Sequence, residues 1–263
     1  MLPDLAIAVM LSRWLRLCKL ASKGCFLSNA TPAGRKKGLV VNAQISDQVA
    51  TPRAGLPAHE VVYRVLRDQV MFGELEPGQP VTIQGLTARL DAGMTPVREA
   101  LRRLTSEGAL AFMGNRRIVV PDLDMAALDQ LALARRALEP ELAARACARI
   151  GAEQVADLTQ IDTRLDAAIQ RGDVRQYLVE NHRFHAELNA IADAPILTGM
   201  VEQLWLRFGP SLRVVCGQIG TMNLPDRHKD LLAALATNDP DAAATAMEAD
   251  VMQGMDQIRQ GLR

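Results

Sequence analysis

Arginines between residues 98 and 103 have the type and the spacing to bind nucleic acid. Arg98 and Arg102 lie four residues apart, so on a helix they share one exposed edge. Guanidinium groups on such an edge donate hydrogen bonds to phosphates or to the edges of bases. Glu99 lies four residues before Arg103 and is expected to neutralise it, which leaves Arg98 and Arg102 as the better DNA contacts. Thr95 and Arg103 are further candidate DNA contacts. The alternative is that these charges only make a surface helix soluble, as most surface charges do.

Two short helices are predicted before these arginines. The first lies between His59 and a stop at Gly73, and its apolar residues recur at spacings of three and four: Val61, Val62, Val65, Leu66 and Val70. A turn with the sequence Glu-Pro-Gly follows. The second helix is shorter, with Leu86 and Leu90 on its apolar side.

The arginines themselves fall on a third helix. It is expected to begin with Thr95 as the N-cap and Pro96 at the first helical position, where the missing N–H costs nothing. It runs to about Glu107, and Gly108 ends it. The predicted buried stripe consists of Val97, Ala100, Leu101 and Leu104.

A hairpin is predicted directly after the third helix. Two β-prone runs, residues 110–112 and 118–120, flank a polar tip with the sequence Gly-Asn-Arg-Arg. Arg116 and Arg117 at this tip are placed to reach phosphates or the minor groove. Three short helices followed by a hairpin predict a winged helix-turn-helix domain over residues 56–121, and this context favours DNA binding over the surface-charge alternative.

Residues 122–263 are predicted to be helical throughout. The expected helices cover residues 124–149, 152–171, 174–192, 195–219, 223–238 and 240–261. Short connections between long helices indicate antiparallel neighbours, hence a helical bundle. Pro140 lies inside the first of these helices and is expected to kink it or to cost it a hydrogen bond. The predicted fold class is therefore mainly α, with an N-terminal winged helix-turn-helix followed by an all-α antiparallel bundle.

Charge is distributed unevenly along the chain. Residues 1–55 contain eight Lys and Arg against two Asp and Glu, residues 56–121 contain eight against seven, and residues 122–263 contain 14 against 21. A basic N-terminal part can approach a polyanion, whereas an acidic C-terminal part does not need to approach one. The first 55 residues are expected to be a disordered basic extension. One interpretation is a flexible arm that adds affinity for phosphates. The other, which is favoured, is an extension without a structural role or a reading frame begun too far upstream.

Several classes of protein are excluded. The four cysteines form no Cys-x-x-Cys pair, so neither a zinc ribbon nor a disulfide framework is indicated. No apolar run approaches the roughly 18–20 residues of a membrane-spanning helix. The apolar stretch Leu5–Leu11 is short, and its basic residues follow it, whereas those of a secretory signal precede it. A cytoplasmic location is expected.

The chain resembles a transcription regulator of the GntR family, of the FadR type with the effector domain called FCD. The resemblance covers about residues 56–263. Its most specific part is residues 95–104, Thr-Pro-Val-Arg-Glu-Ala-Leu-Arg-Arg-Leu, which are followed by Glu-Gly-Ala-Leu at residues 107–110. In the bundle, the residues that match family motifs are Arg135, Leu138 and Glu139, and then Asn181, Phe184 and His185.

Two departures from the family affect DNA reading. Where the family usually has an arginine just before the Thr-Pro pair, this chain has Met94, and where it has one in the second helix, this chain has Gln84. Arginine pairs with guanine, whereas Met94 is suited to a thymine methyl and Gln84 to adenine. The resemblance thus implies an operator that differs from the family's usual palindrome, with Arg98 as the best specific contact.

The resemblance also implies a divalent metal site. The family's carboxylate and three histidines correspond to Asn181, His185, His228 and Asp250. Two imidazoles and one carboxylate suit Zn, Ni, Mn or Fe, while the amide oxygen of Asn181 is a weaker ligand. The alternative is that His182 and His185 are a surface and a core imidazole and that His228 faces solvent.

Arg135 matches the arginine that points into the effector cavity of this family. A guanidinium there suits a carboxylate effector through a two-pronged pair. The alternative is a surface pair with Glu139, four residues on. Arg207 and Arg213 are weaker candidates for the same cavity.

The function predicted from these features is that of a DNA-binding transcription regulator, not an enzyme. It would bind a double-stranded operator as a homodimer, and a small organic acid would modulate its affinity. The family resemblance implies a repressor. The alternatives are a metal-dependent enzyme acting on a small organic acid, and a constitutive DNA-binding protein with a vestigial sensor.

Overall fold

The computed structural model describes residues 56–114, 117–219 and 227–262. The basic extension of residues 1–55 and the predicted DNA contact Arg116 lie outside the described residues. The start of the helix predicted at residue 223 lies outside them too.

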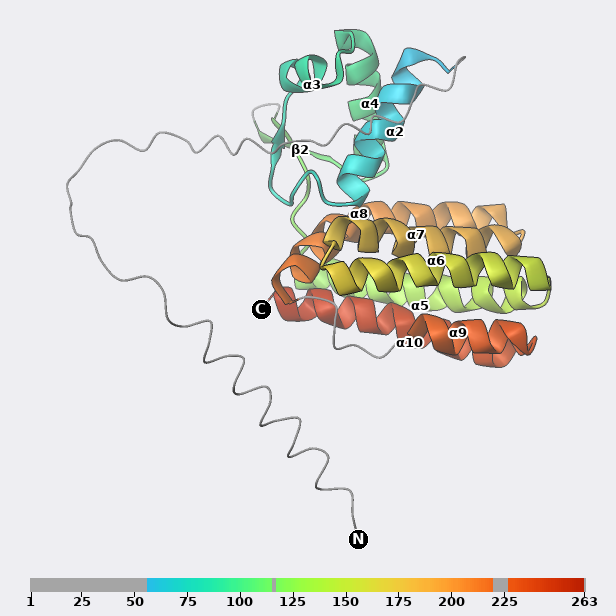
Figure 1. The fold of residues 1–263 in the computed structure, drawn as a ribbon. Coiled ribbons are helices and arrows are strands. Elements are labelled where there is room, and N and C mark those ends of the chain that lie inside the picture. Colours follow the sequence, from blue (N-terminus) through green and yellow to red (C-terminus); the bar gives the residue numbers. More distant parts are fainter. Residues whose placement is uncertain (1–55, 115–116, 220–226, 263) are drawn as a thin grey trace, which may run out of the picture. The chain divides into compact units, whose positions relative to one another are not determined.

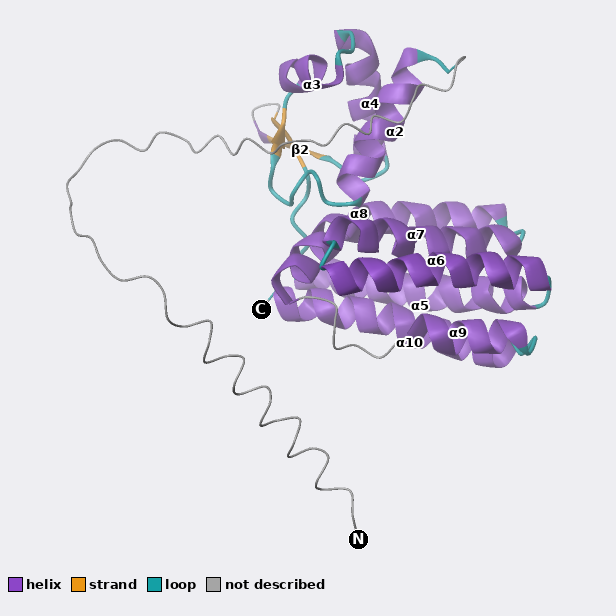
Figure 2. Ribbon diagram, viewed as in Figure 1, coloured by secondary structure: helices purple, strands orange, loops and turns teal. Residues whose placement is uncertain are grey.

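The N-terminal part, here called the head (residues 56–121), is a winged helix-turn-helix fold (Figure 2). Its elements in chain order are α2 (Ala58–Met71), β1 (Pro80–Val81), α3 (Ile83–Leu90), α4 (Met94–Ser106), β2 (Ala111–Met113) and β3 (Arg117–Val119). The strands form an antiparallel sheet in the order β1-β3-β2. The predicted hairpin is therefore present, and β1 adds a strand that the sequence did not reveal, because two residues beginning with a proline carry no alternating pattern.

The predicted turn before β1 forms as its sequence indicates. The amide of Gln79 donates to the carbonyl oxygen of Glu76 at 3.0 Å, with Pro77 and Gly78 between them. Gly78 has a φ of +73°. Proline followed by a glycine of positive φ is the signature of a type II turn. The turn brings Pro80 opposite Val119 in the sheet register.

The core of the head is built from the predicted helix stripes. All four residues of the α4 stripe are buried, and Val62, Leu66 and Val70 of α2 are buried with them. Each of the buried Val and Leu side chains contributes about 1.5–3 kcal/mol on burial. Since the buried stripe of α4 uses one side of the helix, its opposite side remains on the surface.

The C-terminal part is an all-helical bundle (Figure 1). Its helices are α5 (Met125–Cys147), α6 (Ala152–Arg171), α7 (Val174–Ile191), α8 (Pro195–Ile219), α9 (Arg227–Ala236) and α10 (Pro240–Gly261). Aspartate side chains cap three of them, because Asp124, Asp173 and Asp239 each accept a hydrogen bond from the amide three residues on. Gly172, with a φ of +66°, ends α6 before the tight turn into α7. None of the described helices is both long and apolar enough to cross a bilayer.

Proline interrupts two of the bundle helices without ending them. Helix α5 continues through Pro140, and α8 continues through Pro210. Proline has no N–H, so the carbonyl of Arg136 in α5 loses its usual helical donor, as does that of Leu206 in α8. The expected cost at Pro140 is thus a missing hydrogen bond within an unbroken helix.

Candidate functional site

The exposed side of α4 carries the residues predicted to contact DNA. Thr95, Arg98 and Arg102 are exposed, opposite the buried stripe. Met94, at the first position of the helix, is 52% exposed. Gln84 is exposed on α3, the helix that precedes α4 in the helix-turn-helix, and Arg117 is exposed on β3. A side of α4 with two exposed guanidinium groups can bind phosphates and base edges.

The start of α4 differs from the prediction. The N-cap is Gly93, in an extended conformation (φ −64°, ψ 157°), and the helix begins at Met94. The prediction of Thr95 as N-cap is therefore wrong by two residues. Pro96 still lies in the first turn, where amides have no partner within the helix, so its missing N–H is tolerated. Because Thr95 is not a cap, its exposed hydroxyl is available for another partner.

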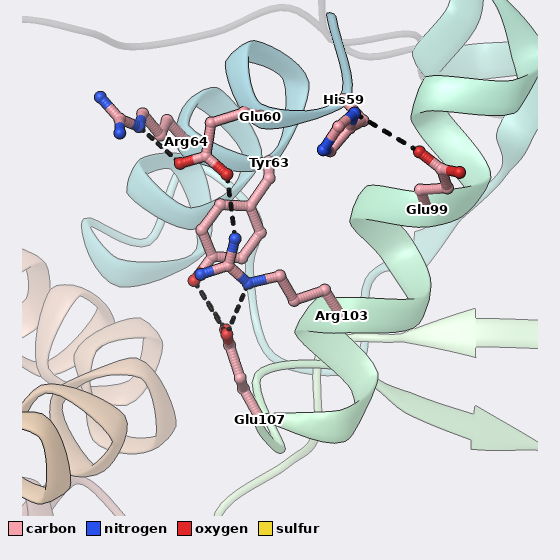
Figure 3. A network of polar contacts seen from close by, with 7 residues as sticks. All are labelled: His59, Glu60, Tyr63, Arg64, Glu99, Arg103 and Glu107. Atoms are coloured by element: carbon pink, nitrogen blue, oxygen red, sulfur yellow. Dashed lines mark hydrogen bonds and ion pairs between the residues drawn. The ribbon is translucent and has the colours of Figure 1, made fainter. Parts of the chain in front are cut away.

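Arg103 belongs to a network that joins α4 to α2 (Figure 3). Its guanidinium lies 3.6 Å from the centroid of the Tyr63 ring. It donates to Glu107 at 3.1 Å and to Glu60 at 3.0 Å. The Tyr63 hydroxyl donates to Glu107 at 2.8 Å, and burial together with this carboxylate raises the pKa of Tyr63 to about 12.

The predicted pair between Glu99 and Arg103 is wrong. Glu99 lies 3.6 Å from His59, while Glu60 and Glu107 are the acidic partners of Arg103. Arg103 was expected to be one of the DNA contacts. In the structure, however, its side chain points toward the Tyr63 ring on α2 and not along the exposed edge of α4 that carries Arg98. We therefore interpret it as a residue that holds α4 against α2.

Arg102 and Arg103 are adjacent, but their substitutions are expected to affect different properties, DNA binding for Arg102 and thermal stability for Arg103. Arg103→Met removes two half-exposed ion pairs and a cation–π contact, so it is expected to cost about 1 kcal/mol, or about 2–4 °C in Tm. Arg102→Met is expected to leave Tm unchanged and to weaken DNA binding by removing a phosphate contact. Thermal unfolding and DNA anisotropy on both variants measure this. Equal loss of Tm in the two variants would contradict the assignment.

In the bundle, three ligand-type side chains from three helices meet. Nε2 of His185 on α7 lies 3.2 Å from Oδ2 of Asp250 on α10. Nε2 of His228 on α9 lies 3.8 Å from Oδ1 of the same carboxylate. One ligand atom from each residue lies within 4.8 Å of the other two. His185 and His228 are both buried, so the alternative that His228 faces solvent is wrong.

A carboxylate lies behind each imidazole. Nδ1 of His228 lies 3.2 Å from Oδ1 of Asp162 on α6, and Nδ1 of His185 lies 3.5 Å from Oε2 of Glu139 on α5. In metal sites, such outer carboxylates fix the ring orientation and leave Nε2 to bind the ion. Here both Nε2 atoms face Asp250.

The charge of Asp250 suits a cation ligand. Burial would raise the pKa of this carboxyl, but the hydrogen bond with His185 and the electrostatic interactions with His185, His228 and Arg135 outweigh it and lower the pKa to about 2. Asp250 is therefore ionised at neutral pH. It provides the negative charge that the asparagine at position 181 lacks.

Aromatic rings enclose the His185–His228–Asp250 cluster. The ring of Phe184 stacks on that of His228 with centroids 4.1 Å apart and an interplanar angle of 7°. The ring of Trp205 on α8 lies 5.4 Å from that of His185. An apolar shell of this kind limits water access and strengthens electrostatic interactions within the site.

The cluster fits a divalent ion. Ligands about 2.0–2.2 Å from a tetrahedral ion lie about 3.4 Å apart, close to the separations of 3.2 and 3.8 Å between Asp250 and the two histidines. Nδ1 of His185 is buried without a hydrogen-bond partner of good geometry, although Glu139 is near. Asn181 is half-buried one turn before His185 on α7, so as a fourth ligand it stays a prediction. Two imidazoles and a carboxylate do not select among Zn, Ni, Mn and Fe.

Arg135 is buried beside this cluster. It forms a salt bridge with Glu139, and its guanidinium lies 4.3 Å from the centroid of the Phe208 ring. The spacing of four residues predicted this pair, but both side chains are almost fully buried, so the surface alternative is wrong. The salt bridge uses Nε and Nη2 of Arg135.

Two weaker candidates for the cavity lie elsewhere. Arg207 is next to Gly108, where a Cβ atom would lie 2.6 Å from Nη2 of the arginine. The side chain of Arg213 fills the space beside Gly73. Both glycines belong to the head, so these arginines lie on a side of α8 that contacts the head.

Some residues of the site were not identified from the sequence. Asp162 and Trp205 have no spacing relation to the histidines that they contact, since 66 residues separate Asp162 from His228. Phe184, by contrast, belongs to a motif that the sequence did reveal, and only its stacking on His228 was missed. Contacts between helices far apart in the sequence leave no periodic signal.

Asp162→Asn is expected to weaken metal binding about 10- to 100-fold, because the amide does not hold the Nδ1–H of His228 as the carboxylate does. Isothermal titration with Zn²⁺ measures the change. Asp157→Asn, an exposed position on the same helix, is the matched control and is expected to have no effect. Equal affinities of the two variants would remove Asp162 from the site.

The fold and the exposed edge of α4 define the protein as a DNA-binding transcription regulator. It belongs to the GntR family: residues 58–120 match the family "Bacterial regulatory proteins, gntR family", and residues 130–252 match the FCD domain. This combination is that of the FadR-type subfamily. The family consists of transcription regulators, so the metal-dependent enzyme considered as an alternative is wrong.

Relatives agree with this assignment. The HTH-type transcriptional regulator McbR of Escherichia coli K12 is 32% identical over 72% of this chain and 86% of its own length. The HTH-type transcriptional repressor RspR of the same strain is 26% identical over 78% of this chain and 90% of its own. A solved structure of E. coli McbR/YncC covers 79% of this chain and 100% of its own, with 29% identity and a TM-score of 0.74.

Proposed function

We propose that this regulator is a cytoplasmic repressor that binds its operator as a homodimer and responds to a small carboxylate. Residues 56–121 form the DNA-binding domain, residues 122–263 form the effector-binding and dimerisation domain, and residues 1–55 are a basic extension. The observation that carries the proposal is the exposed edge of α4, with Arg98 and Arg102 opposite a fully buried stripe. Repression is supported by the name of RspR, a transcriptional repressor.

The homodimer follows from how such heads read DNA. One recognition helix covers one half-site in the major groove, and a two-fold axis places a second helix on the other half-site. Arg98 is the proposed base-reading residue. Thr95, Arg102 and Arg117 are proposed phosphate contacts, and Met94 and Gln84 adjust the preferred bases.

The effector site is proposed at the His185–His228–Asp250 cluster and Arg135. His185, His228 and Asp250, with Asn181 as a weaker fourth ligand, would hold the divalent ion, which supplies a Lewis-acidic anchor for a carboxylate when bound. Arg135 is a cation at the same place, and its guanidinium is oriented by Glu139. A small organic acid is thus the ligand class that the local charges favour.

Regulation is then a matter of linkage. An effector that binds one arrangement of the two heads better than another must change operator affinity by the same factor. A ligand with equal affinity for both arrangements would change nothing, however tightly it bound.

Retardation of the intergenic DNA that flanks the protein's own gene, repeated with a panel of small carboxylic acids, tests the proposal. Retardation that survives random competitor DNA at moderate salt is expected, together with one acid that changes the retained fraction. Lack of any preference over random DNA would contradict specific binding. Specific retardation that no acid alters, with no acid raising Tm, would support the constitutive DNA-binding alternative instead.

A further inference from the structure

Two sides of helix α8 contact different parts of the protein. Trp205 and Phe208 on one side are buried against the His185–His228–Asp250 cluster and Arg135. Glu202 on another side forms an ion pair with Arg67 of α2 in the head. A single helix therefore contacts both the proposed effector site and the DNA-binding head.

The head meets α8 through unusually close backbone packing. A Cβ atom at Gly209 of α8 would overlap the carbonyl oxygen of Met71, the last residue of α2. A Cβ atom at Gly73, just after α2, would overlap the side chain of Arg213. We call Gly209, Pro210, Met71 and Gly73 the α8 joint. Only glycine allows this approach, because any larger residue at position 209 would collide with main-chain atoms that cannot rotate away.

The recognition helix also ends against α8. Gly108, with a φ of +77°, follows α4, and the guanidinium of Arg207 on α8 lies beside it. A cation there complements the negative end of the α4 dipole. The ends of both α2 and α4 therefore rest on the same stretch of α8.

The α8 joint coincides with a gap in the hydrogen bonding of the helix. Pro210 has no N–H, so the carbonyl of Leu206 lacks its helical donor one residue after Trp205. Prolines are the usual sites of bends in helices. A polar link runs alongside: Glu202 contacts Arg67 and also Nε2 of His182 at 3.2 Å, and the His182 ring lies 5.1 Å from that of Trp205.

We propose that the α8 joint transmits changes at the His185–His228–Asp250 cluster to the DNA-binding head. A displacement of Trp205 or Phe208 moves α8 at the Gly209–Pro210 step, and the ends of α2 and α4 follow because they are packed on it. This inference rests on the proposed function, since it requires a DNA-binding head and a responsive bundle. Linkage makes the coupling of the two binding sites reciprocal. We therefore expect DNA binding to change the environment of Trp205.

Trp205 provides the readout. The chain has two tryptophans, Trp14 and Trp205, so a Trp14→Phe background leaves Trp205 as the only one. A DNA fragment selected from genomic DNA by the purified protein is titrated into this variant. Anisotropy of labelled DNA reports binding, and tryptophan emission reports the environment of Trp205.

The variants are matched on α8. Gly209→Ala is expected to force the α8 joint apart and to reduce the DNA-induced change in emission at least about threefold at DNA saturation. Gly217→Ala lies on the same helix, where a Cβ atom meets nothing within 4 Å, and is expected to keep the full change. Glu202→Gln removes the charge of the polar link without a clash and is expected to give a partial reduction, which keeps the test decisive if Gly209→Ala does not fold.

The outcomes separate the inference from the proposed function. DNA binding without any change in Trp205 emission would overturn the transmission and leave the DNA-binding function intact. Equal emission changes in Gly209→Ala, Glu202→Gln and Gly217→Ala would overturn the assignment to the α8 joint. Failure of the purified protein to select any genomic fragment over random competitor DNA would overturn both.

Discussion

Replacing Arg98 with alanine is expected to weaken binding to a selected operator by about 1–3 kcal/mol, roughly 5- to 150-fold. Arg98 is exposed on the edge of α4 that it shares with Arg102, whereas Val97 and Leu101 are buried, so its guanidinium can reach a base edge. A bidentate contact to guanine is lost with the side chain, and the partner groups on the base are left unsatisfied. Because the residue is exposed and away from the core, Tm is expected to stay unchanged.

Competition between the selected operator and variants with single base changes measures this effect. The wild-type protein is expected to reject a changed guanine at one position, whereas Arg98→Ala is expected to accept all four bases there. Arg145→Ala is a suitable control, because Arg145 is exposed on α5 and pairs with Glu141. Equal losses of affinity in the two variants would remove Arg98 from the reading side.

Loss of a cluster ligand is expected to abolish metal binding. His228→Ala and Asp250→Ala each remove one of three groups, and we expect the affinity for Zn²⁺ to fall more than about 100-fold, since an outer partner alone is worth 10- to 100-fold. Elemental analysis of the purified wild-type protein is expected to give about one divalent ion per chain, and that of either variant a small fraction of it. A chelator is expected to lower the Tm of the wild-type protein only, because a bound ion stabilises the folded state.

His59→Ala is the control for the metal experiment. His59 is exposed on α2, and within the described part of the chain its ion-pair partner is Glu99. Its loss is therefore expected to leave the metal content unchanged. Near-zero metal in the wild-type protein, even after dialysis against Zn²⁺, would show that the cluster is a set of hydrogen bonds and ion pairs instead. The DNA-binding assignment would not be affected by that result.

The helices and the head were predictable from the sequence because their signals are local. The α4 stripe of Val97, Ala100, Leu101 and Leu104 repeats with the period of one helix, and all four residues are buried. Glycine ends α2 and α4 as predicted, because a positive φ costs this residue nothing. The family resemblance named His185, His228 and Asp250, and the structure brings ligand-type atoms of these three residues within 4.8 Å of one another.

The tertiary structure decided which side chains meet across helices. Arg103 contacts Tyr63 and Glu60 on α2 rather than Glu99 on its own helix, a choice that depends on how the two helices pack. The carboxylate behind His228 comes from Asp162 on a different helix. The proximity of α8 to the head depends on Gly209, whose missing Cβ makes room for the carbonyl oxygen of Met71. Helical period fixes which residues share a side of one helix, whereas the partner of that side depends on contacts between segments far apart in the chain, which no local spacing records.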